Sequence, residues 1–283
     1  MKTMTNRANL NDIFRPARKL RSDDGHSPAF TTKVPYPATP EIHNPEPTKT
    51  SEWAKIRLDF HPSPKQAEVL DSAAKYLMLC CNRQWGKTTT IAIKALHEAL
   101  KTPSLKIVII SRCREQAGIL IEHATDFAIA LGHPVRRVLG QSFSLKLPNL
   151  SSICAVPHTS DTSVGRTAKI LIVDEAALVK DEVYFSVSPF VARTHGRIWL
   201  LSTPTSQAGY FYNYWHDKTA DWQRIFSNIH DCPEIDRQFL EMQRRANPVK
   251  YQQDFLCEFV QPANRLCSRE FVRSILRKKD QIS

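Results

Sequence analysis

Nearly continuous apolar runs separated by helical segments constrain this fold more than any other feature of the sequence. The runs cover residues 76–81, 105–111, 170–173 and 197–202, and residues 114–131 carry apolar side chains at helical spacing. Strands that are apolar on both faces need cover on both faces, and helical connections between them favour parallel pairing. The sequence therefore predicts an α/β fold: a mostly parallel, doubly wound sheet with helices on both faces.

The first of these runs leads into a turn that ends in Gly-Lys-Thr, and a helical segment, residues 88–100, follows. This order is that of a phosphate-binding loop (Walker A), in which backbone N–H groups and a helix N-terminus bind phosphates. In that motif the lysine contacts the β- and γ-phosphates, and the hydroxyl side chain after it can bind Mg²⁺. Cys81 stands where the motif has its first glycine, so an ordinary strand-to-helix turn competes with this interpretation. The candidate loop comprises Cys81, Asn82, Arg83, Gln84, Trp85, Gly86, Lys87, Thr88 and Thr89.

Two acids follow the run at residues 170–173. Ligands of open α/β sheets bind at the carboxyl ends of the strands, where Asp174 and Glu175 would lie (Walker B). Asp174 is suited to the Mg²⁺ shell around Thr88, and Glu175 to orienting and deprotonating a water molecule. A helix N-cap is the plainer explanation of such a pair. Ser202 and Thr203, at the end of the next run, could sense a γ-phosphate or could form a simple polar turn.

Three further side chains complete the candidate site. Gln66 follows a proline-rich turn in which Ser63 is the expected N-cap and Pro64 the first helical residue. Its amide could contact an adenine edge. Arg83 and Arg166 could each stabilise charge on a transferring phosphate, although a surface ion pair would explain either of them equally well.

Composition and charge narrow the class of protein. The formal net charge of +11 over 283 residues suggests a polyanionic partner, above all nucleic acid, although a merely soluble basic protein is an alternative. No apolar run reaches the roughly 18 residues that span a bilayer, and we expect neither a signal peptide nor membrane contact. The seven cysteines lack C-x-x-C spacing, which predicts reduced thiols in a cytoplasmic setting.

The chain divides into three expected parts. Residues 1–55 are proline-rich and basic without apolar periodicity, and we expect a disordered tail. Residues 56–260 would form the nucleotide-binding domain, and residues 261–283 a basic helical linker.

In sequence order, the motifs resemble those in the ATPase domain of the large subunit of tailed-phage terminases, the DNA-packaging motors of phages and prophages. The matching positions are Gln66, residues 81–88, Gly165-Arg166, residues 173–177 and residues 202–204. Phosphate loops of that family often lack the first glycine and carry Arg-Gln, so the resemblance accounts for Cys81. It covers roughly residues 58–260 and implies a P-loop NTPase fold of the ASCE type.

The resemblance also implies roles and partners. Gln66 would contact adenine, Lys87 and Thr88 the phosphates and Mg²⁺ of ATP, and Asp174 the metal shell. Glu175 would be the catalytic base, Ser202-Thr203 the coupling motif, Arg83 a phosphate contact within the subunit, and Arg166 the arginine presented to a neighbouring subunit. The protein would translocate double-stranded DNA as a homo-oligomeric ring on a portal in the bacterial cytoplasm, with a possible small terminase subunit.

Full-length terminases continue into an RNase H-like nuclease domain, whose acidic cluster we do not find here, so we expect ATPase and no nuclease activity. A helicase-type ATPase is an alternative, although a second motor domain would need about two hundred further residues. A nucleotide-binding remnant with a scaffolding role is another, against which the intact Lys87, Thr88, Asp174 and Glu175 argue.

Overall fold

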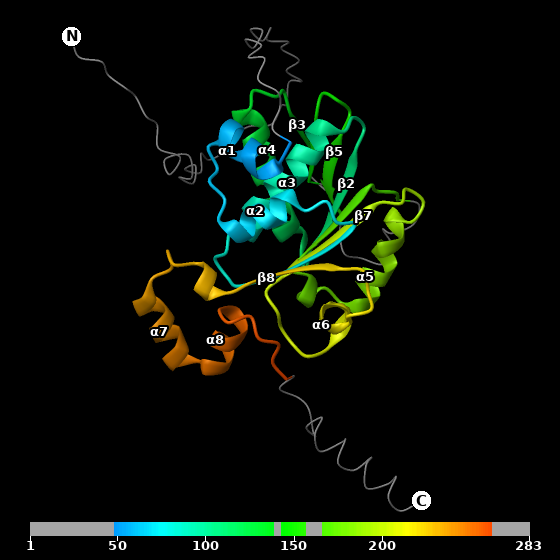
Figure 1. The fold of residues 1–283 in the computed structure, drawn as a ribbon. Coiled ribbons are helices and arrows are strands. Elements are labelled where there is room, and N and C mark those ends of the chain that lie inside the picture. Colours follow the sequence, from blue (N-terminus) through cyan, green and yellow to red (C-terminus); the bar gives the residue numbers. More distant parts are fainter. Residues whose placement is uncertain (1–47, 139–142, 157–165, 262–283) are drawn as a thin grey trace, which may run out of the picture. The chain divides into compact units, whose positions relative to one another are not determined.

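The computed structural model describes residues 48–138, 143–156 and 166–261 (Figure 1). Most of the expected tail and the expected basic linker lie outside these ranges. Helix α1 (Thr50–Leu58) nevertheless begins inside the expected tail, before the predicted boundary at residue 56. Tertiary contacts account for this difference: Trp53 and Ala54 are buried, and Ser51 donates two hydrogen bonds to Asp71, from N at 2.8 Å and from Oγ at 2.6 Å.

Within the described ranges the strands form one eight-stranded sheet, in the order β3-β4-β5-β2-β6-β7-β1-β8. In chain order they are β1 (Tyr76–Cys81), β2 (Lys106–Ile110), β3 (Arg136–Val138), β4 (Ser144–Lys146), β5 (Ser152–Ala155), β6 (Ile170–Asp174), β7 (Arg197–Ser202) and β8 (Gln223–Ser227).

Six of these strands pair in parallel, which confirms the predicted sheet type. β1 lies between β7 and β8, β6 lies between β7 and β2, and β2 also pairs with β5. β4 and β5 form an antiparallel pair, to which β3 is added. The sequence did not predict β3 or β8. Both are edge strands; β3 has only three residues, and β8 mixes buried and solvent-accessible residues instead of forming an apolar run.

Helices cover both faces of the sheet, as predicted (Figure 1). In chain order, the helices of the described ranges are α1, α2 (Pro64–Asp71), α3 (Lys87–Lys101), α4 (Arg114–Ala130), α5 (Asp181–Val187), α6 (Gly209–His216), α7 (Arg237–Ala246) and α8 (Pro248–Asp254), with 3₁₀ turns η3 (Ala176–Leu178), η4 (Ser188–Val191) and η5 (Ile229–Asp231). The helical segment after β6 is divided between α5 and η4, where Pro189 lies near the start of the 3₁₀ turn. None of the helices in these ranges combines the length and apolar character needed to cross a bilayer.

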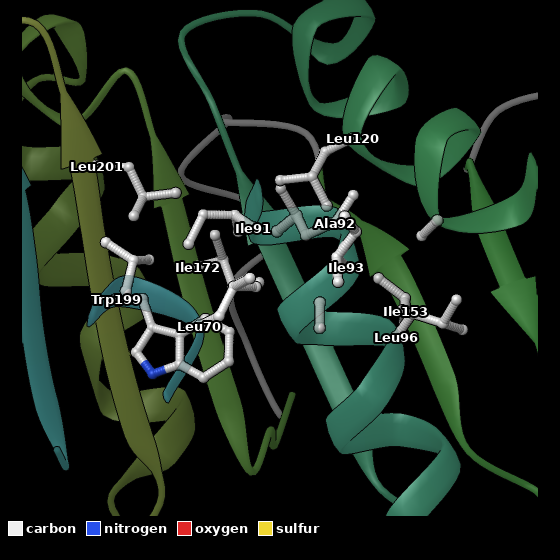
Figure 2. Packing of buried hydrophobic residues seen from close by; sticks show 14 of the residues in the cluster. Leu70, Ile91, Ala92, Ile93, Leu96, Leu120, Ile153, Ile172, Trp199 and Leu201 are labelled. Carbon is white, nitrogen blue, oxygen red and sulfur yellow. The ribbon is translucent and has the colours of Figure 1, made fainter. Parts of the chain in front are cut away.

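Alternating strand residues divide the core into two layers. Ile172, Trp199 and Leu201 face α3 and α4, whose Ile91 and Leu120 pack against them in one cluster (Figure 2). The intervening strand residues belong to a second cluster with the aromatic side chains of α5 and α6. This division follows from the two-residue period of a strand. Parallel pairing places the carboxyl ends of β1, β6 and β7 at one edge of this sheet.

A buried lysine joins the first layer to the chain before β1. Lys94 of α3 is 1% exposed, and its Nζ donates to the carbonyl oxygens of Leu70 and Ser72, each at 2.7 Å. The same ammonium lies 5.2 Å from the ring centroid of Trp199. Burial lowers the pKa of Lys94 to about 8. The contact fixes the end of α2 against the helix that begins at the candidate loop.

Candidate nucleotide-binding site

The loop between β1 and α3 depends on glycine at one position. Gly86 is the N-cap of α3 with φ of 84°, and a Cβ there would lie 2.9 Å from Nε2 of Gln66. A side chain at this position would therefore meet both backbone strain and a close contact. Cys81, by contrast, is the last residue of β1 and pairs with Ser227 of β8. Cys81 therefore belongs to the strand, with its side chain in the core, and this position does not require a glycine.

Lys87 and the two acids meet at the edge of the sheet. Lys87 is the first residue of α3, and its Nζ lies 2.8 Å from Oε1 of Glu175 and 3.8 Å from Oδ1 of Asp174. Burial alone would lower the pKa of Lys87, but the two carboxylates outweigh it and raise that pKa above its ordinary value. Burial raises the pKa of Asp174, and Lys87 opposes this shift. The structure thus brings together the residues that the two predicted motifs supply.

Glu175 has an unusual backbone conformation. Its φ of 51° and ψ of 42° lie in the left-handed region, which residues with a side chain rarely occupy. Its N–H donates to Oδ1 of Asp174 at 3.0 Å, so the buried Asp174 holds the turn that carries the more accessible Glu175. Strained backbone of this kind concentrates at functional positions, where surrounding contacts maintain it.

Ser202 and Thr203, predicted as one nucleotide-contacting pair, have different surroundings. The Ser202 side chain is fully buried; its Oγ accepts a hydrogen bond from N of Ala177 at 3.1 Å and donates one to O of Thr203 at 2.8 Å. Thr203 lines the cleft described below. Thr205 donates to O of Ala177 at 3.1 Å. The end of β7 is therefore hydrogen-bonded to the turn that follows Glu175, and Ser202 acts within this link instead of facing a ligand.

A cleft of about 670 Å³ opens over the loop. Loop residues from Asn82 to Thr89, with Glu175 and Thr203, form its floor, and the adjoining walls come from α4 and α8. The sequence did not predict the wall residues Arg112, Gln116, Ile119, His123, Lys250, Gln253 and Asp254. No local motif marks them, although Arg112 follows β2 at the same sheet edge as Glu175.

Gln66 supports the loop from outside the cleft. Its Oε1 accepts from N of Ser63 at 2.9 Å, which with the Ser63 side chain forms a capping box at the start of α2. Its Nε2 donates to the carbonyl oxygen of Trp85 at 2.9 Å. The predicted N-cap at Ser63 is confirmed. The Ser-x-x-Gln spacing was also a readable signal that this amide belongs to the helix cap.

The two candidate arginines lie in different places. Arg83 lines the cleft, where its Nε donates to Oδ2 of Asp254 at 2.8 Å. Arg166 precedes β6, at the opposite end of that strand from Asp174, and its side chain is exposed outside the cleft lining. The structure therefore does not bring Arg166 to the site of its own chain, and its expected role toward a neighbouring subunit stays a prediction.

Thr88 and Asp174 suit the Mg²⁺ that the fold class implies. Thr88 lines the cleft next to Lys87, and Asp174 is the last residue of β6. In the described part of the chain, no group of three or more His, Cys, Asp or Glu side chains could hold a metal. Mg²⁺ at nucleotide sites commonly uses one or two protein oxygens plus phosphates and water, so a sparse oxygen set fits it.

These features define the class of protein. A phosphate loop after β1, two acids at the carboxyl end of β6 and a parallel strand, β7, between these two strands are the arrangement of an ASCE-type P-loop NTPase. The family model described as "Terminase large subunit, T4likevirus-type, N-terminal" matches residues 78–272, and the chain belongs to this family.

Solved structures share the fold. The ATPase domain of the large terminase from Thermus phage P74-26 is 20% identical with a TM-score of 0.65, covering 75% of this chain and 99% of that one. A large terminase from a thermophilic bacteriophage, in complex with ADP, is 17% identical with a TM-score of 0.61, over 70% of this chain and 53% of that one. The bacteriophage HK97 large terminase is 18% identical with a TM-score of 0.53, over 78% of this chain and 48% of that one. The present chain thus spans about half of the two longer terminases. Among curated protein sequences, none matches it.

Proposed function

We propose that this chain is the ATP-hydrolysing motor domain of a phage DNA-packaging terminase, which translocates double-stranded DNA into a procapsid. The observation that carries the proposal is the contact of Lys87 with Glu175, at 2.8 Å, beside the phosphate loop. It unites a phosphate-binding cation and a candidate base at one sheet edge. Family membership and the ADP and ATP-γ-S complexes of a related large terminase support ATP as the ligand.

Binding of ATP would rearrange this ion pair. Loop N–H groups and the N-terminus of α3 would bind the phosphates, and a phosphate oxygen would compete with Glu175 for the Lys87 ammonium. Glu175, whose side chain is 27% exposed, would then lose its cation partner and accept a hydrogen bond from a water molecule. In this position it orients the water for attack on the γ-phosphate and accepts its proton.

Other residues would supply charge and coupling. Thr88 and Asp174 would hold Mg²⁺, which neutralises charge on the phosphates. Arg83 would donate to the phosphate from within the subunit, and Arg166 from a neighbouring subunit of a ring. The hydrogen bonds of Ser202 and Thr205 to Ala177 give movement at Glu175 a direct path to the end of β7.

DNA would be bound through its phosphates. The formal net charge of +11 favours such contacts, which are sequence-independent and weaken steeply with salt. We place the motor in the bacterial cytoplasm, as a homo-oligomer on a portal with a possible small terminase subunit.

The test is ATP turnover of the purified protein, with and without duplex DNA, beside a Glu175→Gln variant. We expect the amide to lower kcat by at least ~10²-fold, since general-base catalysis contributes about this much, while ATP still binds. Equal kcat values for the two proteins would contradict the assignment of Glu175. Stimulation by single-stranded but not duplex DNA would instead favour a helicase-type ATPase.

A further inference from the structure

The carboxylate of Asp254 lies between two cations at the wall of the cleft. One oxygen, Oδ2, accepts from Nε of Arg83 at 2.8 Å, and the other, Oδ1, lies 2.9 Å from Nζ of Lys250. The backbone oxygen of Asp254 also accepts from N of Arg83 at 2.9 Å. The last residue of α8 therefore holds both the backbone and the side chain of a loop residue about 170 positions away.

The two partners differ in freedom. The Asp254 side chain is 9% exposed, whereas that of Arg83 is 62% exposed. Asp254 is also anchored through the next residue, because Phe255 is buried in the core and its O accepts from N of Ile229 at 3.0 Å. Asp254 is thus the fixed partner, and it determines where the guanidinium of Arg83 lies.

The geometry leaves Arg83 available for a ligand. The guanidinium binds Asp254 through Nε, and its terminal nitrogens carry four further N–H donors. Arg83, Asp254 and the phosphate-loop lysine all lie at the same cleft. A guanidinium fixed at one edge loses less conformational freedom when its other edge binds a phosphate oxygen.

We propose that Asp254 is a positioning residue, which holds Arg83 so that its terminal N–H groups meet the transferring phosphate of ATP. The inference rests on the proposed function and deepens it. It assigns a role to α8, a helix that no sequence motif connected with the phosphate loop. The alternative is that the ion pair only holds the loop against α8, in which case Asp254 contributes to stability but does not act on the reaction through Arg83.

A double-mutant cycle on kcat separates these two roles. We expect Arg83→Ala to lower kcat by ~10²–10³-fold, as when a single charge-stabilising donor is removed. Asp254→Asn should lower kcat by about 10-fold, because an amide holds the guanidinium less firmly. The double variant should be no slower than Arg83→Ala alone. If the two effects multiply instead, Asp254 does not act through Arg83 and the proposal fails.

The matched control is Glu241→Gln, which makes the same charge change on the neighbouring helix α7, where Glu241 pairs with Arg244 and Arg245. Its kcat should stay within about twofold of the wild type, because exposed ion pairs contribute little. A comparable fall in this variant would show that loss of a carboxylate alone explains the result. If Asp254→Asn fails to fold, Asp254→Glu takes its place in the same cycle, with the same expectations.

A binding measurement distinguishes failure of this proposal from failure of the proposed function. The ratio of ADP to ATP-γ-S dissociation constants reports contact with the terminal phosphate. We expect both Asp254→Asn and Arg83→Ala to reduce this ratio, Arg83→Ala by the larger factor, and to leave ADP affinity nearly unchanged. Wild-type protein that binds neither nucleotide would overturn both the function and the inference. Normal wild-type binding with an unchanged ratio in Asp254→Asn would overturn the inference alone.

Discussion

Lys87 and Glu175 form an ion pair across the edge of the sheet, with Nζ and Oε1 2.8 Å apart. They come from different strand–helix units, and β7 separates the strands that lead to them. One residue is expected to bind phosphate and the other to activate water. Their contact therefore brings the residue expected to bind phosphate next to the residue expected to activate water.

Removing Lys87 should damage both nucleotide binding and stability. In Lys87→Ala, Asp174 and Glu175 lose the cation that faces them, and Asp174 is buried. We expect the free energy of unfolding to fall by ~3 kcal/mol, the range for breaking a buried ion pair, and ATP turnover to be lost. Chemical denaturation and nucleotide titration measure the two effects.

Lys87→Arg is the informative control for this change. It keeps the charge, so it should recover most of the stability, but its planar guanidinium does not match the ammonium position and turnover should stay low. Equal stability of Lys87→Ala and wild type would contradict the ion-pair interpretation.

Gly86→Ala should disrupt the loop for two separable reasons. The new methyl group would meet Nε2 of Gln66 at 2.9 Å, and φ of 84° disfavours any side chain. We expect a loss of ~1–3 kcal/mol in unfolding free energy from the strain together with weaker nucleotide binding.

Gly132→Ala is the matched control for Gly86→Ala. Its φ is 76°, and nothing lies within 4 Å of the added Cβ, so it carries the backbone strain alone. It should be less destabilised and should bind nucleotide normally. If both variants lose the same stability and both bind normally, the contact between Gly86 and Gln66 is unimportant.

Lys94 should make stability depend on alkaline pH. Its pKa in the folded protein is about 8, because burial disfavours the charged form, whereas the ordinary value is 10.5. Between these two values the unfolded chain binds more protons than the folded one, so the free energy of unfolding rises with pH. Below pH 8 the buried charge lowers the free energy of unfolding by its full amount, and between pH 8 and pH 10.5 the free energy of unfolding should rise by ~3 kcal/mol.

The measurement for Lys94 is the unfolding free energy of wild type and Lys94→Met at several values between pH 8 and 10.5. The Met variant lacks this titration, so the difference between the two proteins should grow in favour of wild type as pH rises. A constant difference across the range would show that the pKa of Lys94 is not lowered in the folded state.

The class of sheet, the phosphate loop and the two acids could be predicted from local sequence patterns. Each depends on a local pattern: apolar runs long enough to be buried strands, Gly-Lys-Thr after such a run, and Asp-Glu after another. Parallel strands then place their carboxyl ends at one edge, which is why Lys87 and Glu175 could be expected to meet. A cysteine at position 81, in place of the first glycine of the motif, also fits the local pattern, because this residue ends a buried strand.

Tertiary structure alone decided the remaining site. The contact of Arg83 with Asp254 joins segments about 170 residues apart, and no local pattern encodes which distant helix closes a cleft. The surroundings of Gln66, Ser202 and Arg166 were decided in the same way, since each depends on which backbone group or strand end lies nearby. The edge strand β8 also escaped prediction, because its pairing with β1, and not apolar burial on both faces, makes it a strand.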